Sequence, residues 1–233
     1  MGEQPLSRRA RYRAETHEEV KEIALRQLAE GGIGAVSLNA IGKEMGITGP
    51  ALYRYFASRD ALLSSLIIDG YHDLATVVEV TAQQNQQNPP RECLRALAHA
   101  IRLWALAQPH RYLLLYGTPV PGYVAPDDTV SVASRILLPF LAALNTIPVT
   151  GAVPNSRVYM LEDQLETWAQ TRNMPAKGHV LRYGLIWWTR LQGLISLEIE
   201  GHFSLMGFDP ALLYETEVEA LLDSISGPNN QQP

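Results

Sequence analysis

Apolar side chains recur at helical spacing along almost the whole chain, and this periodicity limits the folds open to it more than any other feature. Val20, Ile23, Ala24 and Leu28, for example, would lie on one face of a helix. No segment between turn signals alternates apolar and polar residues over five or more positions, and no strand–helix–strand rhythm is present. The sequence therefore predicts an all-α protein of about ten helices.

Cap residues, prolines and glycines place these helices along the chain. Thr16 and Glu19 form a capping box, Ser37, Thr48 and Ser58 are N-cap residues, and proline opens most of the later helices. The predicted ranges are 16–31, 37–46, 49–56, 58–82, 90–107, 109–116, 126–144, 157–172, 175–202 and 210–226.

The charge is divided unevenly along the 233 residues. Net charge is −5, which argues against a protein that coats nucleic acid, but residues 1–60 hold 9 basic and 8 acidic side chains against 10 and 16 in the remainder. We expect four parts: a flexible basic arm (1–14), a three-helix helix-turn-helix domain (15–60), a larger C-terminal helical domain (61–226) and a disordered tail (227–233).

Targeting and redox signals point to the cytoplasm. Cys93 is the single cysteine, so no intramolecular disulfide can form, and no apolar segment of a signal peptide follows the first residues. The uncharged segment 136–156 is interrupted by prolines, so we expect no membrane span and no membrane partner.

Two short helices joined by a tight turn at Gly46 have the composition of a helix-turn-helix. Leu52 and Phe56 face the core, while the other residues of the third helix project outward or flank the core: Thr48, Gly49, Pro50, Ala51, Tyr53, Arg54 and Tyr55. Tyrosine and arginine suit phosphates and base edges, and the helix starts at Ser37, Thr48 and Ser58 offer N–H groups to phosphate. Alternatively, the tyrosines are half-buried packing residues and Arg54 is merely solvated.

The run from Ile41 to Leu63, with its glycine turn and its Leu52-Tyr53 and Tyr55-Phe56 pairs, resembles the helix-turn-helix of TetR-family transcriptional regulators. The resemblance implies that Thr48, Gly49, Pro50, Ala51 and Arg54 lie near bases, that Tyr53, Tyr55 and Arg59 hold the phosphate backbone, and that Asn39 lies near the groove edge. Arg59 departs from the usual lysine, and Gly42 from the usual alanine.

TetR-like regulators are homodimers whose C-terminal helices bind a small molecule. The helix over 175–202 is apolar nearly all round, and its Trp188 and Gly193 resemble the subclass with a Trp-x-x-x-His-Gly step, although Gln192 replaces the histidine. We expect the last two helices to form a four-helix dimer interface; the alternative is an internal core helix of a monomer. The interface candidates are Gly193, Ser196, Leu212, Leu213, Val218, Leu221, Leu222 and Ile225.

Aromatic and polar-tipped side chains are candidates for an effector pocket, although each could equally be plain core. They are His99, Leu103, Trp104, Tyr116, Phe140, Trp168 and Trp187. The six histidines form no HExxH pair and no phosphate-binding loop is present, so we expect no metal, no cofactor and no enzymatic activity.

The function expected from these features is ligand-responsive, sequence-specific transcriptional regulation. The protein would repress from a pseudo-palindromic double-stranded DNA operator until a small-molecule effector releases it. The alternative is an all-α small-molecule-binding protein or enzyme without DNA binding.

Overall fold

The first helix begins two turns earlier than its capping box predicts. In the computed structural model, which describes residues 7–117, 123, 128–148, 155–172, 174 and 176–226, helix α1 spans Arg8–Gly31. The Ser7 side chain caps it by accepting from the Ala10 N–H at 3.2 Å, and Thr16 lies inside the helix with its hydroxyl on the Tyr12 carbonyl. The predicted arm is therefore wrong for residues 8–14, because arginine and alanine favour helix even without an apolar face. Residues 1–6 lie outside the described part.

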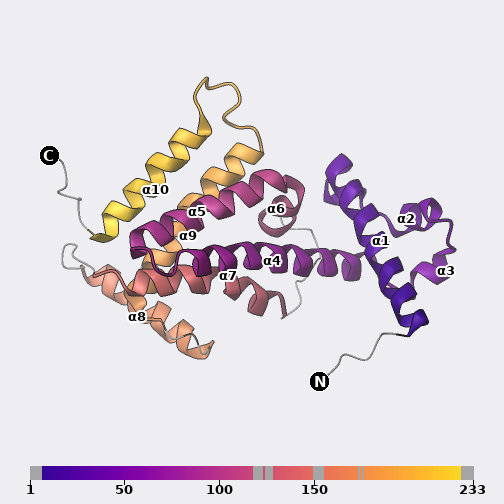
Figure 1. The fold of residues 1–233 in the computed structure, drawn as a ribbon, viewed down its shortest axis with the longest axis horizontal. Coiled ribbons are helices and arrows are strands. Elements are labelled where there is room, and N and C mark those ends of the chain that lie inside the picture. Colours follow the sequence, from indigo (N-terminus) through magenta and orange to yellow (C-terminus); the bar gives the residue numbers. More distant parts are fainter. Residues whose placement is uncertain are drawn as a thin grey trace. The chain divides into compact units, whose positions relative to one another are not determined.

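The remaining helices follow the predicted order (Figure 1). They are the 3₁₀ turn η1 (Ile33–Ala35), α2 (Leu38–Glu44), α3 (Gly49–Leu52), α4 (Arg59–Gln84), α5 (Pro90–Ala107), α6 (Pro109–Tyr116), α7 (Asp128–Asn145), α8 (Ser156–Thr171), α9 (Gly178–Ile199) and α10 (Pro210–Ser226). No strand occurs within the described ranges. The all-α fold is thus confirmed, and the predicted tail 227–233 lies outside the described residues.

The chain divides into two compact units, and the division differs from the expected boundary at residue 60. The N-terminal unit comprises Met1–Gly70 and His110–Thr129, and the C-terminal unit comprises Tyr71–Pro109 and Val130–Pro233. The first part of α4 and α6 from His110 onward therefore belong to the N-terminal unit. Within that unit, Gly70 lies so close to Leu115 that an added Cβ would be 3.2 Å from its Cδ2 atom, and the Ser64 and Tyr123 hydroxyls lie 3.0 Å apart.

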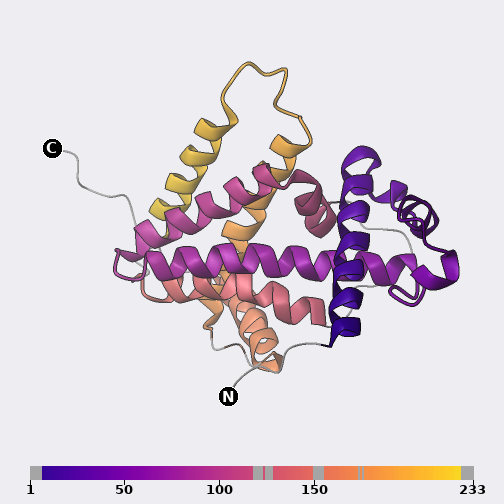
Figure 2. The same ribbon diagram turned by 45° about the vertical axis from the view of Figure 1, so that its right-hand side comes forward.

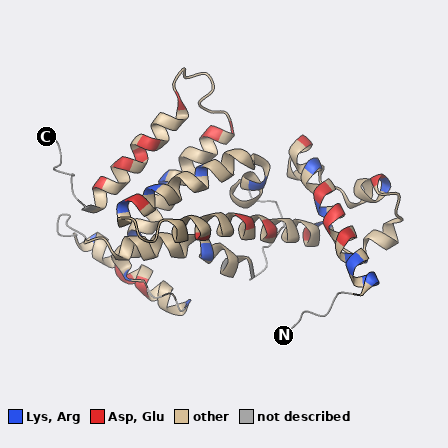
Figure 3. Cartoon of the chain, in the orientation of Figure 1, with Lys and Arg blue, Asp and Glu red and all other residues tan. Residues whose placement is uncertain are grey.

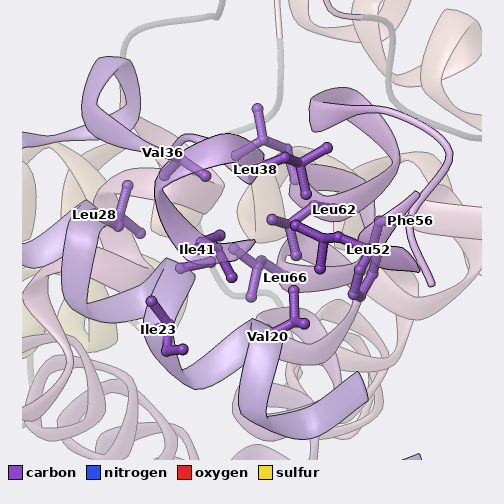
Figure 4. Close-up of a cluster of buried hydrophobic side chains, with 12 residues drawn as sticks. Val20, Ile23, Leu28, Val36, Leu38, Ile41, Leu52, Phe56, Leu62 and Leu66 are labelled. Carbon is purple, nitrogen blue, oxygen red and sulfur yellow. The ribbon is translucent and has the colours of Figure 1, made fainter. Parts of the chain in front are cut away.

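A single apolar cluster holds the N-terminal unit together (Figure 4). Its members come from α1, α2, α3, α4 and their connections: Val20, Ile23, Ala24, Leu28, Val36, Leu38, Ile41, Leu52, Phe56, Leu62, Leu63 and Leu66. Helices as short as α2 and α3 are not stable alone. Burial of each large aliphatic side chain contributes roughly 1.5–3 kcal/mol, so this shared core fixes both short helices.

The C-terminal unit is built around α9, which packs against α5, α8 and α10 (Figures 1 and 2). Two glycines of α9 lie close to neighbouring helices. A Cβ at Gly178 would lie 2.3 Å from the Glu162 carbonyl oxygen, a backbone atom, and one at Gly184 would lie 2.8 Å from Cδ2 of the Leu141 side chain. The buried Tyr214 hydroxyl donates to the Ala98 carbonyl at 2.7 Å and so joins α10 to α5.

Among the described helices, α4 alone is long and apolar enough to cross a membrane by length and composition. Its apolar residues have another role, because Leu62, Leu63 and Leu66 belong to the N-terminal core and Leu74 and Val78 are fully buried as well. The apolar character of α4 is therefore that of a core helix.

Candidate nucleic-acid interface

The turn between α2 and α3 is fixed by a glycine that adopts a left-handed conformation. Gly46 has φ 66°, its N–H donates to the Lys43 carbonyl at 3.3 Å, and the Ile47 N–H donates to the Gly42 carbonyl at 3.0 Å. These two bonds form a Schellman motif, which ends α2 and sets the direction of the chain that follows. The predicted helix-turn-helix junction at Gly46 is confirmed.

Helix α3 is shorter than predicted, because it ends at Leu52 rather than near residue 56. The next three residues continue as hydrogen-bonded turns: the Tyr53 N–H donates to the Gly49 carbonyl at 3.0 Å, and the Tyr55 N–H donates to the Leu52 carbonyl at 2.8 Å. Phe56 is buried in the core, so the chain leaves the helix before this residue and turns into α4. Residues 49–56 thus form one continuous hydrogen-bonded segment, which we call the recognition turn.

The recognition turn separates its side chains into a buried and an exposed set. Leu52 and Phe56 are buried, as predicted, whereas Tyr53 is 50% exposed and Arg54 is exposed. Tyr55 is half-buried and packs against the apolar cluster, so the packing alternative describes Tyr55 but not Tyr53. An exposed tyrosine and arginine on a short turn are well suited to contact phosphate and base edges.

The other predicted DNA residues lie around this turn. Thr48 occupies the N-cap position of α3, but its exposed side chain makes no cap bond; Gly49 and Ala51 are half-buried, and Pro50 and Asn39 are exposed. We call the exposed set the reading face: Asn39, Thr48, Pro50, Tyr53 and Arg54. Because α2 and α3 pack together, these residues of the two helices and of the segments next to them belong to one small helix-turn-helix unit.

Ser37 has a structural task on the edge of this unit. Its side chain caps α2 by accepting from the Ala40 N–H at 3.4 Å, and its own N–H donates to Gln27 Oε1 at 2.9 Å. Gln27 thereby ties α1 to the start of α2, a contact that helical spacing alone did not indicate.

Arg59 has a different environment from the one implied by the family resemblance. Its Nε donates to the Val36 carbonyl at 3.0 Å, and one of its Nη atoms donates to the Ile33 carbonyl. Both acceptors lie in the connection between α1 and α2. This geometry supports a structural tie from the start of α4, rather than an arginine held ready for phosphate. Ser58, next to it, caps α4 through the Ala61 N–H at 3.0 Å.

One aromatic contact behind the recognition turn was not predicted. The His17 ring on α1 lies 4.2 Å from the Phe56 ring, centroid to centroid. Burial of the ring and then the nearby Lys21 cation lower the pKa of His17, which favours the neutral imidazole. This side of α1 therefore lies directly against the end of the recognition turn.

The predicted pocket residues separate in the structure. Phe140 and Trp187 are buried together with ring centroids 6.1 Å apart, and the buried Trp104 donates its indole N–H to Asp73 Oδ2 at 2.9 Å. His99 is half-buried and lies 6.0 Å from the Tyr214 ring.

Three pocket candidates do not join this interior. Leu103 is 64% exposed and Trp168 is 44% exposed, so neither lines the interior of the C-terminal unit. Tyr116 belongs to the N-terminal unit and packs against Tyr112 at 5.1 Å. Helical spacing does not distinguish an inward from an outward apolar face, and the structure places Leu103 and Trp168 on the outward one.

The predicted dimer residues also divide into a buried group and a group at the surface. Val218, Leu221, Leu222 and Ile225 of α10 are at most 1% exposed within one chain, so they cannot contact a partner and that part of the prediction was wrong. The others lie at the surface: Leu212 is 64% exposed, Leu213 is 38% exposed, and Gly193 has nothing within 4 Å of an added Cβ. Ser196 is half-buried.

A buried core shared by α1 to α4, a glycine turn and an outward recognition turn define a helix-turn-helix DNA-binding protein. The model for "Bacterial regulatory proteins, tetR family" matches residues 22–66, and that for "Tetracyclin repressor-like, C-terminal domain" matches residues 94–221. The chain belongs to the TetR family and is a DNA-binding transcriptional regulator; this is a family of regulators, not of enzymes.

Similar proteins agree with this assignment. The chain is 32% identical to the HTH-type transcriptional regulator Rv1816 of Mycobacterium tuberculosis, over 93% of this chain and 95% of the relative. A crystal structure of the regulatory protein SCO4313 is 41% identical, with a TM-score of 0.80, and covers 93% of this chain and 99% of its own. FadR from Bacillus subtilis, solved with stearoyl-CoA, shares the fold at 13% identity and a TM-score of 0.54, with 90% and 99% covered.

Proposed function

We propose that the protein is a homodimeric, cytoplasmic repressor that binds a pseudo-palindromic operator and is released from it by a small-molecule effector. The observation that carries the proposal is the division of the recognition turn, where Leu52 and Phe56 anchor the turn and leave Tyr53 and Arg54 exposed. Arg54 can bond a guanine edge with two N–H groups, whereas Tyr53 can donate to a phosphate. The small residues at Gly49 and Ala51 let the turn approach the groove closely.

The dimer proposal rests on an exposed row along α9. Leu185, Thr189, Gly193 and Leu197 follow one another at four-residue steps and are all exposed. A row at this spacing forms a ridge that can pack against the same ridge of a second copy, and the open glycine permits close approach. The exposed Leu212 and Leu213 of α10 extend the apolar surface available to a partner.

The effector proposal rests on a buried polar atom. Trp187 is 1% exposed, and its indole N–H has no hydrogen-bond partner within the described part of the chain. A buried donor without an acceptor is unfavourable by roughly 1–3 kcal/mol, so a bound effector that supplies an acceptor beside Phe140 and Trp187 would be stabilised. Release requires that the effector prefer the conformation with low DNA affinity, because equal affinity for both conformations would shift nothing.

The dimer and the repressor role can be tested separately. Light scattering at micromolar concentration should report two copies, and Leu212→Glu together with Leu197→Glu should shift the protein toward the monomer, whereas Glu215→Gln, an exposed neighbour on α10, should not. A reporter gene placed behind a bound sequence should be repressed by the wild type and not by Arg54→Ala. A monomeric wild type would contradict the proposed dimer, and activation of the reporter by the wild type would contradict the repressor role.

A further inference from the structure

The first two turns of α1 form an ordered basic surface. Arg8, Arg9, Arg11 and Arg13 are all exposed there, and the ribbon in Figure 3 carries the blue of Lys and Arg at the first turns of α1. The Ser7 cap holds these turns in the helix, so the arginines occupy defined positions rather than a free arm.

The four arginines lie on two opposite sides of the helix. At 100° per residue, Arg9 and Arg13 share one side with His17, whereas Arg8 and Arg11 lie on the opposite side. Arg11 is paired there with Glu15 at 3.7 Å. Among the residues that the structure describes, no carboxylate pairs with Arg9 or Arg13.

The side that carries Arg9 and Arg13 is continuous with the recognition turn. His17 lies one helical turn beyond Arg13 and stacks on Phe56, which directly follows residues 53–55. Arg13 is also close enough to His17 to help lower its pKa. All of these residues belong to the N-terminal unit, so their relationship is set within one compact body.

Unpaired guanidinium groups in a row repel one another and favour a polyanion as partner. Arg9 and Arg13 lie about 6 Å apart along the helix axis, which is comparable with two base-pair steps of a duplex, where the phosphates of one strand follow at about 3.4 Å along the duplex axis. These turns have no apolar face that could enter a membrane, and Tyr12 is their one large apolar side chain. The charge and the neighbouring recognition turn therefore favour DNA.

We propose that Arg9 and Arg13 bind backbone phosphates just outside the base pairs that the recognition turn contacts. The inference rests on the proposed function and adds a second contact, which would increase affinity for every sequence alike because phosphates carry no sequence information. The contact also requires the bound duplex to extend beyond the base pairs that the recognition turn contacts.

The test compares two double variants that remove the same charge from the same two turns. Arg9→Ala with Arg13→Ala removes the proposed contact, whereas Arg8→Ala with Arg11→Ala alters the opposite side. Fluorescence anisotropy with a duplex selected by the wild type from random DNA gives the affinity at several salt concentrations. Each lost phosphate contact should reduce the slope of log K against log salt by about 0.9.

We expect the Arg9/Arg13 variant to lose about 10- to 100-fold in affinity at low salt and to reduce the slope by about two units per bound head. The control variant should remain within about threefold, and Arg9→Lys with Arg13→Lys should retain most of the slope. Trimming the duplex flush with the recognised bases should weaken the wild type and leave the Arg9/Arg13 variant unchanged.

Two outcomes would overturn the inference, and they differ in what they say of the proposed function. If the wild type binds the selected duplex but both double variants behave alike, the α1 contact is absent and the recognition turn still stands. If the wild type binds neither selected nor random duplex, the proposed function fails together with the inference. Circular dichroism checks that each variant keeps its helix content.

Discussion

Lys21 of α1 and Asp69 of α4 form an ion pair, with the Lys21 Nζ atom 2.7 Å from Asp69 Oδ2. The lysine is buried, and Glu18 accepts a second bond from the same Nζ at 2.7 Å. Burial alone would lower the pKa of Lys21, but the hydrogen bonds to Asp69 and Glu18 outweigh it, and the pKa is raised. The pair therefore fixes α1 to α4 behind the recognition turn.

Replacing Lys21 should weaken the N-terminal unit. Lys21→Met leaves Asp69 without its buried partner, and because that carboxylate is partly solvated we expect a loss of about 1–2 kcal/mol in the free energy of unfolding at pH 7. Urea unfolding measures this, with Lys43→Met on the exposed face of α2 as control. Because the pKa of Lys21 is raised, the stability that its charge contributes is fully present below the ordinary lysine pKa of 10.5 and is lost as pH rises through the raised value. The difference in unfolding free energy between the wild type and Lys21→Met should therefore shrink at high pH. Equal stability of Lys21→Met and the wild type at pH 7 would contradict the pair.

Acid should weaken the connection between α5 and α10. Glu219 accepts from Arg95 Nε at 2.7 Å and from Arg91 at 3.1 Å, and the Arg95 bond, more than any other contact, lowers the pKa of Glu219. Because the pKa of Glu219 is lowered, the ionised carboxylate contributes its full stability to the fold above the ordinary pKa of 4.5. This contribution is lost as pH falls through the lowered value.

The Glu219→Gln variant should accordingly be less stable than the wild type by about 1 kcal/mol at pH 7, with the difference vanishing well below pH 4.5. Thermal unfolding at several pH values measures it. Glu215→Gln, an exposed neighbour on α10, is the control and should follow the wild type throughout. A constant difference between Glu219→Gln and the wild type down to pH 2 would show that the carboxylate charge is not responsible.

Two glycines of α9 should respond in opposite ways to alanine. At Gly178 a Cβ would lie 2.3 Å from a backbone carbonyl oxygen, so Gly178→Ala should destabilise the chain by about 2–3 kcal/mol. At Gly193 the space is open, so Gly193→Ala should keep the fold or stabilise it by up to about 1 kcal/mol. If Gly193 lies in the proposed dimer interface, Gly193→Ala should also weaken self-association, which a dilution series measures. Unchanged self-association would show that the interface lies elsewhere.

Arg59 offers a choice between a structural and a DNA-binding role. Lysine keeps the charge but cannot bond the Ile33 and Val36 carbonyls with the same fork, so Arg59→Lys should reduce the free energy of unfolding by about 1 kcal/mol. Arg59→Ala, which removes the charge, should change the salt dependence of DNA binding little. Unaltered stability of Arg59→Lys, together with a reduced salt slope for Arg59→Ala, would restore the phosphate role implied by the family resemblance.

Local signals predicted most of the fold. Proline at positions 90, 109 and 210 and serine at 58 mark helix starts correctly within a residue, because a first-turn proline or cap acts on its own neighbours. The error at α1 has the same origin, since Thr16 is a plausible cap in isolation and Ser7 is a better-placed one. The recognition turn was predictable because burial of Leu52 and Phe56 forces Tyr53 and Arg54 outward.

Features that depend on distant residues were not predictable. Arg59 bonds carbonyls 23 and 26 positions earlier in the chain, and periodicity carries no information on such a pairing. In the same way, the apolar face of α10 indicates burial of Val218 and Leu222 but not whether their own chain or a second copy covers them. The dimer prediction failed at residues of this kind.

Selection of bound duplexes from a random DNA pool tests the proposed regulator most directly, with the wild type and Arg54→Ala compared. The predicted result for the wild type is enrichment of a pseudo-palindrome with two half-sites about one helical turn or more apart, because each copy presents one reading face. Arg54→Ala should still bind DNA but lose preference at one position of each half-site. Failure of the wild type to enrich any sequence, or enrichment of a single half-site without its mate, would contradict a dimeric, sequence-specific regulator.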